Sequence, residues 1–235
     1  YMPPPGRMRT DAIARALAYL GNPHLAYERA QVIGTNGKGA TALYLSAIIE
    51  EHGVKTGLYT SPHLLSWRER FMAGGREISE AEFGALYFSL KPVFKKFHLT
   101  QFERLTLMAA EFFKRQGVRF AVLETGLGGT GDAVTALAAP LLLYTAITPE
   151  HRDMLGPTIK HISTAKAGPL AGARAAFSCG QPYKTTAGVL RAAARKSGAK
   201  LEFCVSAKAV KTTRRGVEFE LEDKVWRLPS FGQKN

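Results

Sequence analysis

The sequence predicts an α/β protein with a P-loop-type, doubly wound, mostly parallel sheet, helices on both faces and a small antiparallel arm near the C-terminus. Three observations predict it. Short, fully apolar segments alternate with segments of helical periodicity, which is typical of a parallel sheet covered on both faces. The glycine-rich stretch VIGTNGKGAT, residues 32–41, directly follows the first apolar segment. Near the end, Val217, Phe219 and Leu221 alternate with glutamates, which favours a hairpin.

Five segments show the periodicity of helices. In the first, Ile13, Leu17 and Leu20 recur on one face. Gly53 and Gly117 stand where the second and fourth helices would end, because glycine readily adopts the left-handed conformation of a helix C-terminus. The expected helices span residues 8–20, 39–51, 79–90, 102–116 and about 185–197.

Continuous apolar runs are expected to form the strands. They span residues 30–33, 57–60, 118–124, 140–148, 174–178 and 201–205, followed by the hairpin arm at 216–228. In such a sheet, function lies at the carboxyl ends of the strands. Lys38 follows the first strand, Ser61 and His63 the second, Glu124 a later one and His151 the next. Their repeated placement at one edge indicates a site there.

Composition limits the classes of function. The 32 Lys and Arg against 19 Asp and Glu give a formal charge of +13, which favours anionic partners such as phosphates, polycarboxylates or nucleic acid. The basic residues are spread out without an aromatic stripe, so a nucleic-acid-binding module is the weaker alternative. The two cysteines form no CxxC pair, which argues against a disulfide framework or zinc site and fits a reducing cytoplasm. The longest apolar stretch, 133–147, is broken by Pro140 and is too short for a membrane span.

The glycine-rich stretch is expected to bind phosphate. Gly34, Gly37 and Gly39 allow backbone N–H groups to approach an anion, the following helix adds its positive N-terminus, and Lys38 can reach a terminal phosphate. It departs from the usual G-x-x-x-x-G-K-[ST] pattern, because the spacing is shorter and no hydroxyl follows the lysine. A glycine-rich turn with an exposed lysine is the alternative, but the order of strand, loop and helix favours nucleotide binding.

A nucleoside triphosphate requires magnesium, which prefers hard oxygen ligands. Ser61, Glu124 and His151 are the candidate ligands that could replace the missing hydroxyl. Each also has a simpler interpretation, as a turn cap, a strand end and a surface histidine. Lys166 would by default be a charge at a helix end.

Several segments together resemble the folylpolyglutamate synthase and dihydrofolate synthase family of the Mur ligase superfamily. They are, in order, LGNPHL, GTNGKGAT, GLYTSPHLLSWRERF, REISEAEF, QFERLTLMAA, AVLETGLGGTGDA and PEHRDMLGPTIKHISTAKAG. The resemblance covers residues 8 to about 182. It explains the short loop without a hydroxyl after the lysine, which is that family's own variant.

The resemblance implies an ATP-dependent amide ligase. In that family, ATP phosphorylates the carboxylate of a folate or of dihydropteroate to an acyl phosphate, and the amino group of L-glutamate attacks it. It implies ATP and two Mg²⁺ ions as cofactors, with small-molecule substrates and neither nucleic acid nor membrane as a partner. We accordingly expect a cytoplasmic monomer.

Site residues are carried over by position. The resemblance assigns the triphosphate to Gly34, Thr35, Asn36, Gly37, Lys38, Gly39, Ala40 and Thr41. It assigns magnesium to Ser61, Glu124, His151 and Lys166, with Lys166 carried as a carbamate. The expected catalytic residues are Lys38, His151 and Lys166. The expected substrate-binding residues are Pro62, His63, Leu64, Arg70 and Asp132, most of them in a loop over the folate site at 61–70.

The match also contains departures. Ala40 stands where the family has serine, Thr130 where it has arginine, and Thr135 where it has asparagine. These departures leave two alternatives, an ATP-binding relative that does not ligate and another Mur-type ligase acting on a cell-wall precursor. The opening LGNPH and the TSPHL segment favour the folate branch.

Family members carry a second domain, which binds glutamate. We expect residues 1–235 to be the Mur-ligase-like central ATP-binding domain without that second domain, and LPSFGQKN to resemble the start of the hinge leading to it. Such a chain should bind ATP but should not complete ligation alone.

Overall fold

The computed structural model describes residues 10–205, 207–213 and 216–229. Its strands are β1 Glu28–Ile33, β2 Thr56–Tyr59, β3 Phe71–Ala73, β4 Arg76–Glu77, β5 Phe120–Glu124, β6 Leu141–Tyr144, β7 Ala175–Ser178, β8 Lys200–Phe203, β9 Lys208–Thr213, β10 Gly216–Leu221 and β11 Lys224–Pro229. Its helices are α1 Asp11–Tyr19, α2 Lys38–Glu51, α3 Glu80–Lys96, α4 Gln101–Arg115, α5 Arg152–Leu155, α6 Ile159–Ala167 and α7 Lys184–Ser197. Short 3₁₀ helices are η1 Pro23–Ala26, η2 Trp67–Arg70, η3 Ala133–Leu137 and η4 Gly168–Gly172.

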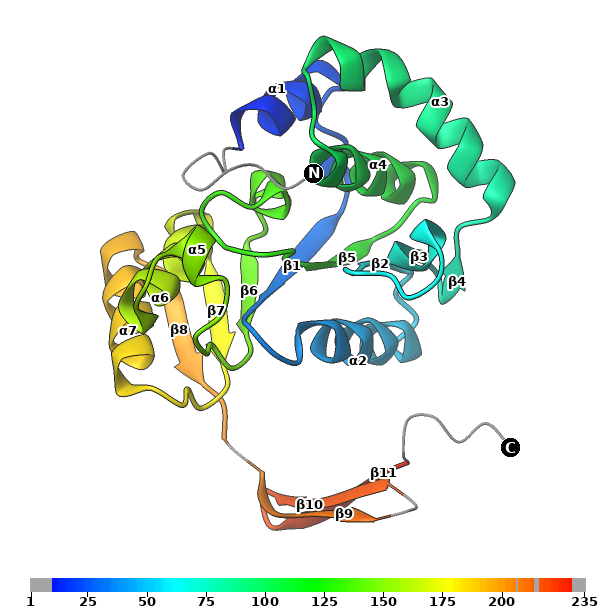
Figure 1. Cartoon of the computed structure of the whole chain (residues 1–235). Coiled ribbons are helices and arrows are strands. Elements are labelled where there is room, and N and C mark those ends of the chain that lie inside the picture. The colour runs from blue at the N-terminus through cyan, green and yellow to red at the C-terminus, as the bar shows by residue number, and fades with distance from the viewer. Residues whose placement is uncertain (1–9, 206, 214–215, 230–235) are drawn as a thin grey trace.

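The strands form two sheets (Figure 1). The larger has the order β4-β3-β2-β5-β1-β6-β7-β8, and the smaller has the order β11-β10-β9. In the larger sheet the six strands from β2 to β8 in this order pair in parallel, while β3 and β4 add an antiparallel edge. The predicted α/β class, the mostly parallel sheet and the antiparallel arm are confirmed.

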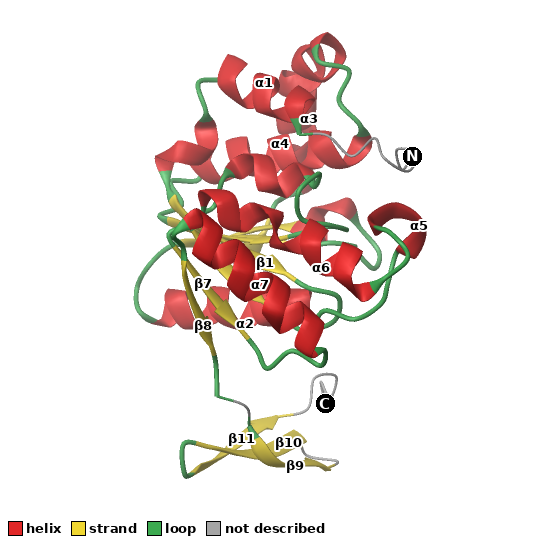
Figure 2. Ribbon diagram, turned by 90° about the vertical axis from the view of Figure 1, so that its left-hand side faces the viewer, coloured by secondary structure: helices red, strands yellow, loops and turns green. Residues whose placement is uncertain are grey.

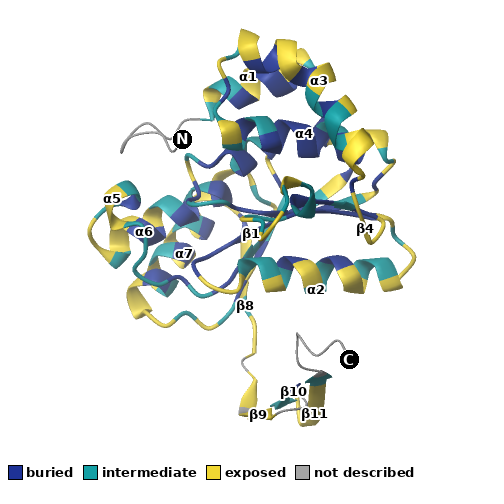
Figure 3. Cartoon of the chain, turned by 45° about the vertical axis from the view of Figure 1, so that its right-hand side comes forward, coloured by how far each residue is buried: buried dark blue, intermediate teal, exposed yellow. Residues whose placement is uncertain are grey.

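Helices cover both faces of the larger sheet. Val32 and Val122 pack with Ala42 of α2 on one face. Leu123 and Ile33 point to the other face, into the clusters formed with α1, α3 and α4 and with α6 and α7. Figure 2 shows α7 in front of the sheet with α6 beside it, and Figure 3 shows burial concentrated in the central strands and the facing side of α4. Among the longer described helices, α2 thus covers one face of the sheet, and α3, α4 and α7 lie on the other side.

Two boundaries differ from expectation by four residues or more. The helix expected at 79–90 continues as α3 to Lys96, through Pro92. Proline removes one intrahelical bond, and the carbonyl it frees belongs to Phe88, a residue that is largely exposed, so water can replace the donor. The strand expected at 140–148 ends at Tyr144, because the chain beyond it leaves the ladder to contact the glycine-rich loop. The arm has a further strand, β9, which pairs with β10.

The antiparallel edge strands β3 and β4 were not expected from the sequence. Gly74 and Gly75 join them, with φ values of 57° and 70°. Two consecutive residues with positive φ are typical of the tight hairpin turns that suit twisted strands. The Gly-Gly pair between them was therefore the available signal.

Residues 1–9 and 230–235, which include the start of the first expected helix and the expected hinge, lie outside the described residues. Within the described part of the chain, every helix is too short or too polar to traverse a bilayer.

Arg29 connects the start of β1 to η1 and to the end of η3. Its Nη1 donates to the backbone oxygen of His24 at 3.1 Å, and its Nη2 donates to that of Ala138 at 3.1 Å. His24 is buried, and its Nδ1 has no hydrogen-bond partner among the described residues. Burial, with a smaller contribution from the charge of Arg29, lowers the pKa of His24 to about 4.

His24 should make stability fall at acidic pH. Its pKa in the folded chain, about 4, lies below the ordinary 6.5, so the unfolded chain takes up the proton first as the pH falls. The contribution is complete above pH 6.5 and is lost between pH 6.5 and 4. Denaturant unfolding across this range should show the wild type losing roughly 1–3 kcal/mol more than His24→Leu, after allowance for screening by solvent. Parallel pH curves for the two proteins would contradict this.

Candidate functional site

The glycine-rich loop connects β1 to α2. Gly37 has φ 82° and occupies the N-cap of α2, where no side chain of the described residues caps the helix and no acidic residue lies in the first turn. The positive end of this helix is therefore left available for an anion. Asn36 and Ala40 are exposed beside it, and Lys38, Gly39 and Thr41 are half-buried.

Gly34 is required by a close approach of the backbone to Thr145, the residue after β6. A Cβ atom at this position would lie 1.9 Å from the Oγ1 of Thr145, which is far inside contact distance. The next residue continues the same contact. Thr35 N donates to the oxygen of Ala146 at 2.9 Å, and its hydroxyl donates to the oxygen of Thr148 at 3.1 Å while accepting from Thr148 N at 3.1 Å. The side chain of Thr35 thus fixes the loop to the segment after β6.

Lys38 is folded back over the loop. Its Nζ donates to the backbone oxygen of Thr35 at 3.0 Å. That bond places a cation directly beside the N-terminus of α2, where an anion would bind.

Glu124 and Ser61 come together at the mouth of the loop. Glu124 ends β5 and is buried, and its Oε2 accepts a hydrogen bond from Ser61 N at 2.8 Å. A Cβ atom at Gly39 would lie 3.4 Å from the same oxygen, so the carboxylate borders the loop. Burial raises the pKa of Glu124, against smaller lowering effects from the Ser61 bond and the charges of Lys38 and Arg70. Its Oε1 accepts no hydrogen bond from the described part of the chain and is free for a ligand.

The loop at 61–70 is organised by Glu69. Its two oxygens accept hydrogen bonds from the backbone N of Leu64 at 2.7 Å, Leu65 at 2.8 Å and Ser66 at 2.6 Å. These bonds hold the pKa of Glu69 below its usual range. They also leave Leu64, an expected substrate contact, 91% exposed at the tip.

Arg70 anchors the other end of this loop. It is buried, its Nε donates to His63 Nδ1 at 3.0 Å, and its guanidinium stacks on Trp67 at 5.0 Å. Pro62, in a cis peptide bond after Ser61, is exposed. Among the expected substrate contacts, Arg70 and His63 are thus paired with each other, whereas Pro62 and Leu64 face solvent.

His151 lies at the start of α5 with φ 50°, and its Nε2 is 3.5 Å from the Glu150 Oε1. Both side chains are partly exposed. Among the described residues, no three His, Cys, Asp or Glu side chains are grouped as metal ligands would be. Of the expected magnesium ligands, the structure therefore joins Ser61 and Glu124 by a hydrogen bond, and the shared site with His151 stays a prediction.

Lys166 is buried between two parts of the site. Its Nζ donates to the backbone oxygens of Gly34 at 2.7 Å and Leu127 at 3.1 Å, so it connects the glycine-rich loop to the segment after β5. Burial and, to a smaller extent, the charge of Lys38 lower the pKa of Lys166 to about 8, against smaller raising effects from Glu150 and Asp132. The simple assignment as a charge at a helix end does not describe this side chain.

Asp132 is committed to the backbone around it. Its Oδ2 accepts from Leu127 N at 2.9 Å and Gly128 N at 3.4 Å, and its Oδ1 accepts from Val134 N at 3.0 Å. Burial raises its pKa, although these bonds and the charge of Lys166 oppose the shift. The expected substrate contact thus shapes the loop that leads into η3.

The departures Thr130 and Thr135 are accommodated in the same loop. Thr130 donates from Oγ1 to the oxygen of Ala165 at 3.0 Å. Thr135 donates to the oxygen of Gly129 at 2.7 Å and accepts from Gln31 Nε2 at 3.0 Å. Both hydroxyls are used to hold the loop against α6 and β1.

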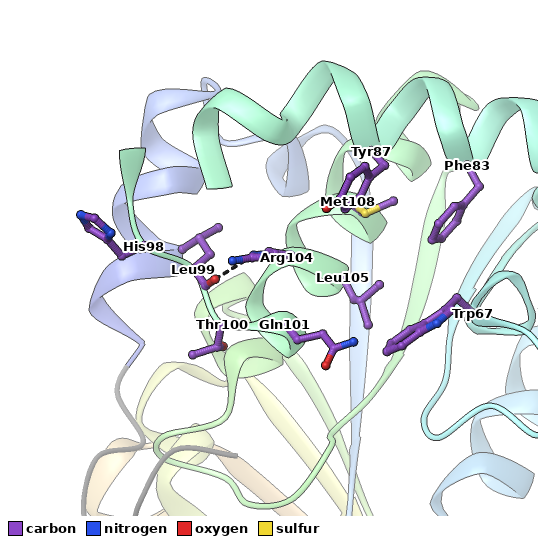
Figure 4. A pocket seen from close by; sticks show the side chains of 10 residues that line it. All are labelled: Trp67, Phe83, Tyr87, His98, Leu99, Thr100, Gln101, Arg104, Leu105 and Met108. Carbon is purple, nitrogen blue, oxygen red and sulfur yellow. Dashed lines mark hydrogen bonds between the residues drawn. The ribbon is translucent and has the colours of Figure 1, made fainter. Parts of the chain in front are cut away.

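A cavity of about 580 Å³ lies elsewhere, between α3, α4 and η2 (Figure 4). Trp67, Phe83 and Leu105 line one end, and Arg104 lies along its wall, bonded to the oxygen of Leu99 at 2.8 Å. Its lining includes Trp67 of the loop at 61–70, but none of the individually expected site residues. We place the candidate site at the glycine-rich loop, because the buried ionisable groups and the uncapped helix end meet there.

The sequence pattern did not reveal the residues that support the loop from β6. Thr145, Ala146 and Thr148 were expected to continue a strand, yet they hold Gly34 and Thr35 in place. Gln181 holds this segment in turn, accepting from Ile147 N and donating to the oxygen of Thr145, both at 3.0 Å. The hydroxyls clustered in YTAIT were the only sequence signal.

Gly34→Ala should abolish the loop's ability to bind an anion. The added methyl group would displace Thr145, with an expected cost of about 1–3 kcal/mol in unfolding free energy. The double variant Gly34→Ala/Thr145→Ala removes the nearest atom and should recover part of both stability and binding. Thermal unfolding and calorimetric titration with nucleotide would check this. A single variant as stable as the wild type would show that the contact does not constrain the loop.

Known proteins resemble much of the chain. No family model matches the chain. Over 163 residues it is 40% identical to a probable bifunctional folylpolyglutamate synthase/dihydropteroate synthase of Haloferax volcanii, covering 67% of this chain and 20% of the relative. Over 197 residues it is 34% identical to the dihydrofolate synthase/folylpolyglutamate synthase of Escherichia coli, covering 83% of this chain and 43% of the relative.

A solved structure agrees with these relatives. The Mycobacterium tuberculosis folylpolyglutamate synthase complexed with ADP and AMPPCP superimposes with a TM-score of 0.87 at 29% identity, covering 96% of this chain and 55% of that one. The chain thus spans about half or less of the proteins that it matches. With the glycine-rich loop, Glu124 and Lys166 placed as described, the chain belongs to the folylpolyglutamate synthase/dihydrofolate synthase family.

Proposed function

We propose that the chain is the ATP-binding part of a ligase that joins L-glutamate to the carboxylate of a folate or of dihydropteroate through an acyl phosphate. The observation that carries this proposal is the meeting of the uncapped α2 N-terminus, Lys38 and the buried Glu124 at one edge of the sheet. The names of the relatives, which combine folylpolyglutamate and dihydrofolate synthases, support the substrate class. The ADP and AMPPCP bound to the M. tuberculosis protein support the nucleotide.

The residues present fit a nucleoside triphosphate. Gly34 and Gly37 hold the backbone in a turn whose helix end suits a polyphosphate, and Lys38 supplies a cation beside it. The backbone of residues 34–41 would bind and orient the phosphates, and Lys38 would neutralise the charge nearest the acceptor.

The residues also fit a divalent cation. Glu124 offers one unused carboxylate oxygen beside the loop. Ser61, whose backbone N–H binds the other oxygen, also carries a side-chain hydroxyl. Magnesium favours such oxygen ligands and would supply charge stabilisation to the transferring phosphate. We propose Ser61, Glu124 and His151 as ligands of this cation.

We further propose that Lys166 is carbamylated in the active protein. Carbon dioxide adds to a neutral amine, and the pKa of about 8 leaves part of the Lys166 population neutral at mildly alkaline pH. The product is a carboxylate-like group suited to a second magnesium ion. In the unmodified form the Nζ donates to the oxygens of Gly34 and Leu127. Modification would replace these two hydrogen bonds with a group that binds a metal ion.

The remaining functions of the ligase are assigned to residues outside this chain. We propose that a glutamate-binding domain, which the family resemblance implies, completes ligation; the chain covers 43% of the E. coli relative. We propose a monomeric, cytoplasmic enzyme.

Lys38→Ala should abolish ATP binding without unfolding the chain. It removes the cation beside the α2 N-terminus and one hydrogen bond to Thr35, at a cost to stability of about 0.5 kcal/mol. Lys55→Ala is a matched control, because the Lys55 Nζ also donates to a backbone oxygen, that of Gln116, on the exposed surface. Unchanged ATP affinity of Lys38→Ala in calorimetric titration would sink the proposed role.

Glu124→Gln should weaken magnesium binding without weakening metal-free nucleotide binding. The amide oxygen can still accept from Ser61 N, so the loop should keep its shape, while the negative charge for magnesium is lost. Titrations with and without Mg²⁺ should show that the variant keeps metal-free affinity and loses at least about tenfold of the magnesium-dependent gain. An intact magnesium effect would remove Glu124 from the ligands.

Lys166 modification should depend on pH. In bicarbonate buffer with magnesium, the carbamylated fraction seen by ¹³C NMR should rise as the pH passes through about 8, because the neutral amine becomes available. Lys166→Arg, which retains a donor but cannot be carbamylated in this way, is the control. A carbamyl signal equal in both proteins would assign the modification to another site.

A further inference from the structure

The two cysteines of the chain lie opposite each other across two parallel strands. Ser178, the last residue of β7, pairs with Phe203, the last residue of β8. Cys204 N donates to the oxygen of Ser178 at 2.8 Å, so the ladder continues one step beyond the strands. Cys179 and Cys204 are therefore the next pair in register, although 24 residues separate them in the sequence.

The two side chains share one face of the sheet. Ala176 and Leu201, which pair with each other, pack toward α7, and the ring of Phe203 lies under the guanidinium of Arg191 on that helix at 4.5 Å. Successive residues of a strand point to opposite faces, so the residues after Ser178 and Phe203 point away from α7. Neighbouring strands lie about 4.8 Å apart, within the Cα separation of about 4.4–6.8 Å that disulfides span.

The thiols differ in exposure. Cys204 is exposed, whereas Cys179 is half-buried and its Sγ lies 3.6 Å from the Gln181 Nε2. Burial, and to a smaller extent the charge of Cys204, raises the pKa of Cys179, which agrees with their closeness in space. Cys204 is thus the more accessible group for a reagent, and Cys179 is the group beside it.

We propose that Cys179 and Cys204 form an oxidative modification site, in which a low-molecular-weight disulfide converts the two thiols into a cross-strand disulfide. The Cys204 thiolate attacks the reagent disulfide, forms a mixed disulfide and releases one reagent thiol. The Cys179 thiolate then attacks the Cys204 Sγ and releases the second reagent thiol. The two cysteines lose two electrons and two protons, and the reagent disulfide is reduced to two thiols. Both cysteines stand just past the strand ends, where the backbone can adjust to the bond.

The site lies at the carboxyl edge of the sheet that also carries the glycine-rich loop. Gln181 contacts Cys179 and binds the backbone of Thr145 and Ile147, the segment that supports Thr35. The bond would also fix the end of β8, from which the chain leads to the arm. The inference does not depend on the proposed ligase activity.

The test treats the reduced full chain with oxidised glutathione and measures intact mass, followed by peptide mapping. The expected product is lighter than the reduced chain by about 2 Da, carries no glutathione and joins Cys179 to Cys204. Its midpoint of thermal unfolding should rise by about 5 °C and return on reduction. Persistent glutathione adducts on both cysteines, a disulfide between two chains, or no reaction would each overturn the proposal.

Matched variants test the register itself. Cys179→Ser should stop at a stable glutathione adduct on Cys204, because the second thiol is missing. The double variant Phe203→Cys/Cys204→Ser moves the thiol by one residue to the face of α7, and it should form no bond to Cys179. An intramolecular disulfide of equal yield in this control would show that proximity in the ladder is not the cause, and would overturn the proposal.

Discussion

The register of β1 between β5 and β6 is the constraint on which the rest of the site depends. Val32 pairs with Glu124 on one side, and Ile33 pairs with Tyr144 on the other. Because the three strands are parallel and in step, their carboxyl ends deliver the glycine-rich loop, the Glu124 carboxylate and Thr145 to the same place. The close approach of Gly34 to Thr145 is possible only in this register. Loops from distant parts of the sequence therefore meet at this edge, where hydrogen bonds such as those of Thr35 with Thr148 and of Lys166 with Gly34 join them.

Three carboxylates differ in how many backbone N–H groups they bind, and therefore in their roles. Glu69 and Asp132 each accept from three backbone N–H groups and thereby shape their loops. Glu124 accepts from one, that of Ser61. A buried carboxylate with spare acceptor capacity is costly unless a cation or donor completes it. The unused oxygen of Glu124 lies next to an uncapped helix end, and binding a cation or a donor there would stabilise the buried carboxylate.

The cations around the loop follow the same logic. Lys38 and Lys166 both donate to backbone oxygens of the glycine-rich loop, to Thr35 and Gly34 respectively. Lys38 remains half-exposed and free to exchange that bond for a phosphate. Lys166 is enclosed, so desolvation weakens its hold on the proton. Two lysines that bind one loop thus differ chiefly in how far they are buried.

The sequence by itself determined the α/β class, the strand–loop–helix order and the edge of the sheet that carries the site, because these follow from apolar periodicity and from glycine spacing. It placed Lys38 and Glu124 correctly at strand ends, and its motifs identified the family. It could not show that Thr145 and Thr148 support the loop, that Asp132 is consumed by backbone N–H groups, or that Cys179 faces Cys204. Those relations depend on register and on burial, which arise only when strands far apart in the chain pair and exclude water. Pattern along a chain reports which face a residue shares with its neighbours, whereas the partner across the sheet is decided by tertiary structure.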